Sequence, residues 1–231
     1  MKSIAYELMC AAVRNLYGKW RQDFRMFSPR WQQTRLDFPY DSRELSDVKP
    51  RVRESVASRH DRQRTRESVR MSVLEDVLAP NLRIVFCGTA VGAASALRRA
   101  YYAGPGNAFW PTLFRIGLIP IRLEPEQYKC ITEYRLGLTD LAKAVSGSDR
   151  MLSRQHFDGD GLRAKMRYYS PKVLAFTSKR AAEEFVGRPV EYGRLEDVIG
   201  STQLFVLPSP SGAARRYWSQ QPWRDLANLV Q

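Results

Sequence analysis

Two glycine-marked stretches of this sequence have the residue types of a binding site for a flat, polar ligand. GTAVGAAS follows one apolar run and contains Gly88 and Gly92, and SPSGAARR follows another and contains Gly212. Glycine has no Cβ atom, so a ligand can come close to the backbone amides beside it. The small side chains around these glycines leave room for a planar group. We therefore expect the floor of the pocket to be backbone rather than side chain.

The elements that must position these stretches alternate along the chain. Three apolar runs are typical of buried strands, at residues 82–87, 172–176 and 203–208. Helical spacing of apolar residues predicts helices over 107–116, 125–135, 157–169 and 179–185. This alternation predicts an α/β fold, a three-layer sandwich whose central, mainly parallel β-sheet is flanked by helices. Such sheets bind ligands beyond the carboxyl ends of their strands, where both stretches would lie.

The composition indicates a polyanionic partner and no metal. The formal net charge is +13 and the isoelectric point is near 10.0, which favours nucleic acid first and a membrane surface second. Three cysteines without a CxxC pair argue against a disulfide framework, an iron–sulfur cluster or a four-cysteine zinc site. No window approaches the ~20 apolar residues of a membrane span. We therefore expect a soluble, cofactor-free protein of the bacterial cytoplasm that binds no membrane.

Residues 1–70 differ in character from the rest of the chain. Apolar residues at helical spacing predict an amphipathic helix over 3–20. Beyond it, three prolines and the run RVRESVASRHDRQRTRESVR favour disorder or a solvated helix over a dedicated DNA-binding arm. The pattern thus divides the chain into a basic N-terminal extension, 1–70, and a domain, 71–231.

The domain carries several motifs in one order: LAPNLRIVFCG, GTAVG, YYAGPGNAFW, GLTDL and LPSPSGAARR. This order resembles the mismatch-specific uracil and thymine DNA glycosylases of the uracil-DNA glycosylase superfamily. Their chains run from LAPxLR through a GINPG loop, an aromatic residue, GNxFW and GxT to a PS-rich loop. The resemblance implies a DNA repair enzyme that flips uracil out of double- or single-stranded DNA and hydrolyses its N-glycosidic bond, leaving an abasic site. We expect it to act as a monomer.

The resemblance also implies which residues contact the base. Tyr102 falls on the aromatic residue that covers the flipped base, and the Thr89 backbone amide would face the base oxygens, where negative charge develops. The whole uracil-binding set is Gly88, Thr89, Ala90, Tyr102, Asn107 and Ser209. Three alternatives stay open: Tyr102 packs a core edge, Asn107 caps the helix that begins there, and Ser209 serves a turn.

The first motif departs from the family pattern, because Ala90 replaces the Asn that positions the attacking water in many relatives. Asp140 of GLTDL is the candidate catalytic substitute, since a carboxylate can orient water and stabilise a cationic sugar. Alternatively, Asp140 would lie in the first turn of a helix over LAKAV. The missing Asn leaves a non-catalytic DNA-lesion binder as the alternative function. A pocket enlarged at Ala90 could instead admit another deaminated base, such as hypoxanthine.

The second glycine-marked stretch would penetrate the DNA and fill the gap left by the flipped nucleotide. The residues of this wedge are Ser211, Gly212, Ala213, Ala214, Arg215 and Arg216. Alanines fill a base stack poorly, so we expect little dependence on the opposite base and good use of single strands. Phosphate contacts are expected from the cations that flank the pocket, which are Arg98, Arg99, Arg154, Lys179, Arg215 and Arg216.

Overall fold

The computed structural model describes residues 72–230 of the protein. The helix predicted over 3–20 and the basic run before residue 71 lie outside these residues, so the division of the chain at residue 71 stays a prediction. Within residues 72–230, no helix combines the length and the apolar character that crossing a membrane requires.

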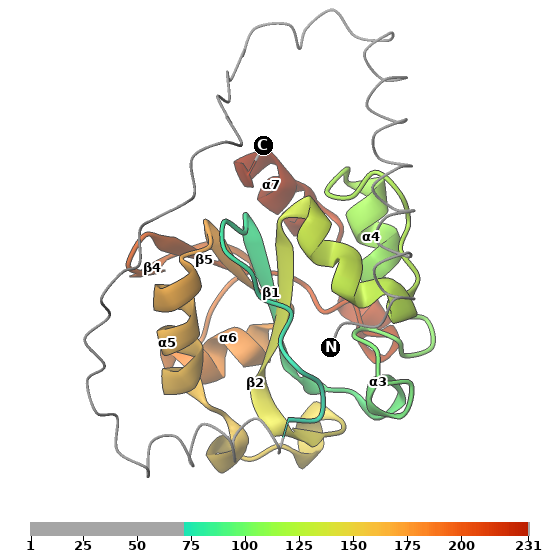
Figure 1. Ribbon diagram of the computed structural model, residues 1–231. Coiled ribbons are helices and arrows are strands. Elements are labelled where there is room, and N and C mark those ends of the chain that lie inside the picture. Colours follow the sequence, from blue (N-terminus) through green and yellow to red (C-terminus); the bar gives the residue numbers. More distant parts are fainter. Residues whose placement is uncertain (1–71, 231) are drawn as a thin grey trace, which may run out of the picture.

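A five-stranded sheet in the order β2-β1-β3-β5-β4 forms the centre of the domain (Figure 1). Pairing is parallel from β2 through β5, and β4 pairs antiparallel with β5 at one edge. The mainly parallel sheet predicted from the sequence is therefore confirmed. The strands are β1 (Ile84–Val91), β2 (Leu136–Ser146), β3 (Val173–Phe176), β4 (Gly193–Ile199) and β5 (Thr202–Val206).

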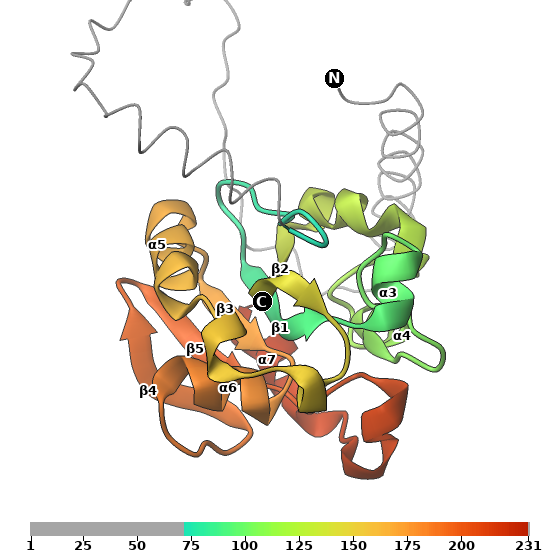
Figure 2. The ribbon, with the colours of Figure 1, turned by 90° about the horizontal axis from the view of Figure 1, so that it is seen from below.

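Helices cover both faces of the sheet, as Figure 2 shows from one end. One face carries α3 (Ala93–Leu97), α4 (Phe109–Arg115), the 3-10 helix η1 (Pro125–Tyr134) and α7 (Gln221–Val230). The opposite face carries α5 (Gly159–Tyr169) and α6 (Lys179–Val186). Three further 3-10 turns lie in loops: η2 (Asp149–Met151), η3 (Arg154–His156) and η4 (Gly212–Tyr217). The predicted three-layer α/β sandwich is confirmed.

The central strand β1 shows why an apolar run makes such a sheet. Ile84 and Phe86 belong to the apolar cluster on the α4 face, and Val85 and Cys87 belong to the cluster on the α5 face. All four side chains are fully buried, because side chains alternate between the two faces of a strand. Burial of each large apolar side chain contributes about 1.5–3 kcal/mol, so the run anchors both layers.

Two strands and two α-helices are not predicted by the sequence pattern: β2, β4, α3 and α7. The interpretation of LAKAV as a helix is wrong, because β2 runs through it and pairs with β1 from Leu136 to Ser146. The predicted helix over 125–135 is a 3-10 helix, and the one over 107–116 begins at Phe109. Strand β4 lies at the sheet edge with exposed residues between buried ones, which leaves a weak apolar signal.

The segment before β1 is tied to the sheet by backbone hydrogen bonds. The Val73 amide donates a hydrogen bond to the Lys143 carbonyl (2.8 Å), and Val77 exchanges two backbone hydrogen bonds with Leu138 (both 2.9 Å).

We predict that a chain beginning at Met71 folds like the full chain and keeps its activity. A chain beginning at Pro80 should lose roughly 3 kcal/mol of folding free energy, because it also loses Asp76, the partly buried ion-pair partner of Lys143. Urea unfolding followed by circular dichroism would measure the stability of the two shortened chains. Equal unfolding midpoints for these two chains would contradict this boundary.

Candidate active site

Gly88 of β1 and Asp140 of β2 lie side by side, one step beyond the level at which the neighbouring strand β3 ends. They are paired in the register of β1 and β2, and a Cβ atom on Gly88 would lie 2.6 Å from Oδ1 of Asp140. The carboxylate therefore occupies the space that any larger residue at position 88 would need. Glycine at position 88 therefore allows the Asp140 side chain to lie close to the backbone of β1.

The stretch from Gly88 to Val91 belongs to β1 and not to a loop, so the predicted loop after the first strand is corrected. Its backbone stays extended because β2 continues beside it, with Ala90 paired to Ala142. On the other side, β3 ends at Phe176, and Thr177 donates its amide to the Cys87 carbonyl (2.9 Å). Beyond Cys87, β1 thus has a strand neighbour on only one side, the position at which α/β sheets commonly form a ligand-binding crevice.

Asp140 is buried without full compensation for its charge. It is only 5% exposed, and its Oδ2 atom has no hydrogen-bond partner among the described residues. Burial raises the pKa of Asp140 to about 6, although the Lys143 ammonium, 3.7 Å from Oδ2, and the Tyr101 hydroxyl oppose this rise. A buried carboxylate with an unused oxygen is suited to hold a water molecule or a cationic group.

Lys143 is held beside Asp140 by a network that the sequence pattern does not reveal. Its Nζ atom donates to the Tyr101 hydroxyl (2.9 Å) and lies 2.9 Å from Oδ1 of Asp76. The other carboxylate oxygen of Asp76 lies 2.7 Å from Lys165 Nζ. Burial alone would raise the pKa of Asp76, but the two lysines lower it below its usual value. Asp76 is therefore an ionised carboxylate that orients Lys143.

Tyr102 lies in a turn with a φ of 55° and is half-buried. One face of its ring stacks on Phe109, with centroids 3.8 Å apart and planes 11° apart, and its hydroxyl lies 3.3 Å from Oγ1 of Thr177. The alternative that Tyr102 packs at the edge of the core therefore holds for one face of its ring. A base could stack only on the opposite face, and this role of Tyr102 stays a prediction.

Three polar residues of the predicted site already bind local backbone. Asn107 Oδ1 accepts from the Phe109 amide at the start of α4 (2.9 Å). Ser209 Oγ accepts from the Ser211 amide, and Ser211 Oγ accepts from the Ala213 amide (both 3.3 Å). The turn alternative therefore describes the serines, whereas Asn107 bonds the first residue of α4 from the position before the N-cap, which is Ala108. Their contacts with a base or a phosphate stay predictions.

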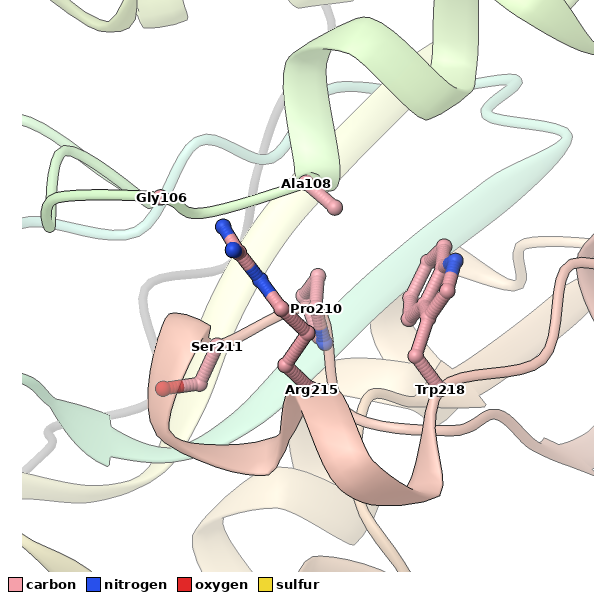
Figure 3. A pocket seen from close by; sticks show the side chains of 6 residues that line it. All are labelled: Gly106, Ala108, Pro210, Ser211, Arg215 and Trp218. Carbon is pink, nitrogen blue, oxygen red and sulfur yellow. The ribbon is translucent and has the colours of Figure 1, made fainter.

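The predicted wedge is folded into η4 and is packed against a second segment. Residues 104–108 and 208–218 together form what we call the rim. The Ala108 amide donates to the Pro210 carbonyl (2.8 Å), and a Cβ atom on Gly212 would lie 2.6 Å from the Pro105 carbonyl oxygen. Figure 3 shows Arg215 of η4 and Trp218, the residue after η4, facing the same space as Ala108. Two segments about 100 residues apart therefore act as one unit.

The predicted phosphate-binding cations fall into two groups. Three are already close to carboxylates: Arg98 to Glu126 (2.6 Å), Lys179 to Glu191 (2.7 Å) and Arg154 to Glu184 (3.9 Å). Three are exposed and have no ion-pair partner within residues 72–230: Arg99, Arg215 and Arg216. Unneutralised positive charge is thus placed after α3 and on η4.

The mainly parallel sheet with helices on both faces is an α/β fold, a class of domain that binds ligands beyond the carboxyl ends of its strands. The family model described as the uracil DNA glycosylase superfamily matches residues 75–227, about two thirds of the chain. The chain therefore belongs to the uracil DNA glycosylase superfamily. This membership implies a DNA substrate and supports an activity as a DNA glycosylase, which is a hydrolase of DNA repair.

A solved structure with a similar fold comes from Methanosarcina acetivorans. It is a solution NMR structure of a protein described as a "putative Uracil DNA glycosylase". The two sequences are 23% identical, the TM-score is 0.48, and the match covers 68% of this chain and 96% of that one.

We predict that Gly88→Ala lowers the free energy of unfolding by about 1–3 kcal/mol, because its new Cβ must displace the Asp140 carboxylate in a packed layer. The matched control is Gly92→Ala, since Gly92 is exposed and no atom lies within 4 Å of an added Cβ. Its effect should stay within about 0.5 kcal/mol. Urea unfolding of the three proteins measures this, and equal effects of the two substitutions would show that Asp140 does not occupy that space.

The raised pKa of Asp140 makes a second prediction, on stability. Between pH 3.8, the ordinary value, and about 6, the folded state holds a proton that the unfolded state releases, so stability falls as pH rises through this window. Above this pH window, the ionised Asp140 lowers the free energy of unfolding by roughly 3 kcal/mol. Asp140→Asn should therefore raise the unfolding midpoint at pH 8 and leave it nearly unchanged at pH 4. Thermal unfolding at both pH values checks this, and a variant that is less stable at pH 8 contradicts it.

Proposed function

We propose that this protein is a monofunctional uracil-DNA glycosylase, which takes uracil out of the DNA stack and cleaves the bond between the base and its deoxyribose. The observation that carries the proposal is the buried Asp140 carboxylate with an unpartnered oxygen, in a member of this superfamily. The motif order, which resembles the mismatch-specific enzymes, supports uracil as the base. Ala90 offers no carboxamide, so the water must be held by another group.

Asp140 can supply both functions that the reaction needs. As the bond between C1′ and N1 breaks, the sugar becomes cationic and uracil leaves as an anion. The carboxylate stabilises the cation and accepts a proton from the water that attacks C1′. Uracil takes up a proton on release, and the product is an abasic site. The fixed charge of Lys143 supports this role, because it favours the ionised form of Asp140.

The backbone of β1 supports the proposed contact with the base oxygens. Peptide groups alternate in direction along a strand, and the Cys87 carbonyl points towards Thr177 on the β3 side. The Thr89 amide is two residues further on and therefore points to the same side, beyond the last residue of β3. A donor there would stabilise negative charge on a base that lies in the crevice. Tyr102 would cover that base with the ring face that does not stack on Phe109.

We predict that the protein releases uracil from a labelled single-stranded oligonucleotide, and that Asp140→Ala lowers the single-turnover rate by a factor of about 100 or more. The ionised carboxylate is the active form, so the wild-type rate should be constant above pH 7. It should fall about tenfold per pH unit below pH 6, where Asp140 takes up a proton. Alkaline cleavage of the abasic product measures the rate.

The matched control is Asp160→Asn, because Asp160 is an exposed carboxylate in the first turn of α5. It should leave the rate unchanged. Full activity of Asp140→Ala would overturn the catalytic assignment. Binding of the oligonucleotide without release by the wild-type protein would select the lesion-binder alternative. Release from hypoxanthine but not uracil oligonucleotides would keep the chemistry and change the base.

A further inference from the structure

A cavity of about 290 Å³ lies between the two segments of the rim (Figure 3). It adjoins the start of α4, the helix whose Phe109 stacks on Tyr102, so it is close to the proposed base slot. None of the residues proposed to bind uracil lines it. The lining residues are Gly106, Ala108, Pro210, Ser211, Arg215 and Trp218.

The walls of this cavity have the chemistry of a nucleobase site. Gly106 and Ala108 contribute almost no side chain, which leaves a flat space, and Figure 3 shows the Trp218 ring and the Arg215 guanidinium bordering it. Aromatic rings and guanidinium planes are the groups on which proteins stack unpaired bases. The volume is at the lower end of that of small-molecule sites, so it suits one planar heterocycle.

The Trp218 ring is held in place by packing, and the Arg215 guanidinium lies close to Gly106. Trp218 packs against the buried Trp223, with ring centroids 5.7 Å apart, and its amide donates to the Arg215 carbonyl (3.3 Å). Gly106 has a φ of 68°, and a Cβ atom there would lie 3.0 Å from Nη2 of Arg215. The guanidinium therefore lies close to the backbone at residue 106, where a larger residue than glycine would crowd it. Arg215 has no carboxylate partner within residues 72–230, so its charge stays available to DNA.

We propose that this cavity binds one unpaired base of the DNA strand that carries the nucleotide to be excised. The base would stack on Trp218, with the Arg215 guanidinium at its edge or over its face. The proposal rests on the proposed function only in taking DNA as the ligand and does not require release of uracil. It also accounts for a wedge built of Ala213 and Ala214: a strand anchored by stacking in the cavity needs no bulky side chain in the duplex.

The test uses the full chain and a uracil-free single-stranded oligonucleotide with 2-aminopurine at successive positions. Wild-type protein should change the fluorescence of 2-aminopurine most strongly at one position, where the base enters the cavity. Trp218→Ala should abolish this positional signal and weaken binding roughly 5- to 150-fold, the range for loss of one stacked base. The matched control Tyr217→Ala removes an exposed ring that does not line the cavity and should change neither readout.

Two further variants keep the test decisive if Trp218→Ala fails to fold. Ala108→Leu fills the cavity without removing a ring or a charge, and it should also abolish the positional signal. Arg215→Ala and Arg216→Ala should each reduce the slope of log affinity against log salt concentration by about one, because each removes one phosphate contact. Only Arg215→Ala should alter the 2-aminopurine signal as well, because Arg216 does not line the cavity.

The outcomes separate this proposal from the glycosylase proposal. Unchanged binding and signal in both Trp218→Ala and Ala108→Leu would overturn the cavity site, even if the wild-type protein releases uracil. Equal losses from Tyr217→Ala and Trp218→Ala would also overturn it, because the effect would then belong to the surface in general. A positional signal lost only in the cavity variants would support it, even if no uracil is released.

Discussion

The close approach of the Asp140 carboxylate to the backbone of Gly88 determines the rest of this site. Parallel pairing of β1 and β2 brings the two residues into register, and the absence of a Cβ atom leaves room for the carboxylate inside the layer. A buried carboxylate is unfavourable unless charges or hydrogen bonds compensate it. Here the compensation is partial, because Lys143 lies 3.7 Å from Oδ2 and no hydrogen bond reaches that oxygen from the described residues. Such residual instability is common where a side chain is kept ready for chemistry.

The segment before β1 belongs to the site through electrostatics. Asp76 contacts both Lys143 and Lys165, and it also accepts a hydrogen bond from Thr139 (2.7 Å). Because Lys143 lies close to both Asp76 and Asp140, its position beside Asp140 also depends on Asp76. Backbone bonds of Val73 and Val77 to β2 hold this segment in place. Stability of the domain edge and the ionisation of Asp140 are therefore linked.

The rim adds a second level of organisation around the strands. Close backbone approaches at Gly106 and Gly212 join a segment before α4 to the segment after β5. Trp223 of α7 binds the Pro208 carbonyl through its ring nitrogen (3.2 Å) and is fully buried, so the rim is fastened to the core. This arrangement places the exposed Arg215 and the half-buried Trp218 around one cavity. The basic charge of the chain and its membership of a DNA glycosylase family fit such a surface.

Local patterns in the sequence determined much of this protein. Continuous apolar runs predict β1, β3 and β5, and helical spacing predicts α5 and α6, because these signals depend on neighbours within a few residues. The order of the motifs was enough to indicate the superfamily. The individual roles were not settled, since Asn107 can either cap α4 or contact a base with the same carboxamide.

Only the tertiary structure decided that Gly88–Val91 and LAKAV are strands, because their extended backbone depends on pairing with each other. It alone brought Asp76, Lys143 and Lys165 together, since their positions depend on where the chain crosses the sheet and not on local spacing.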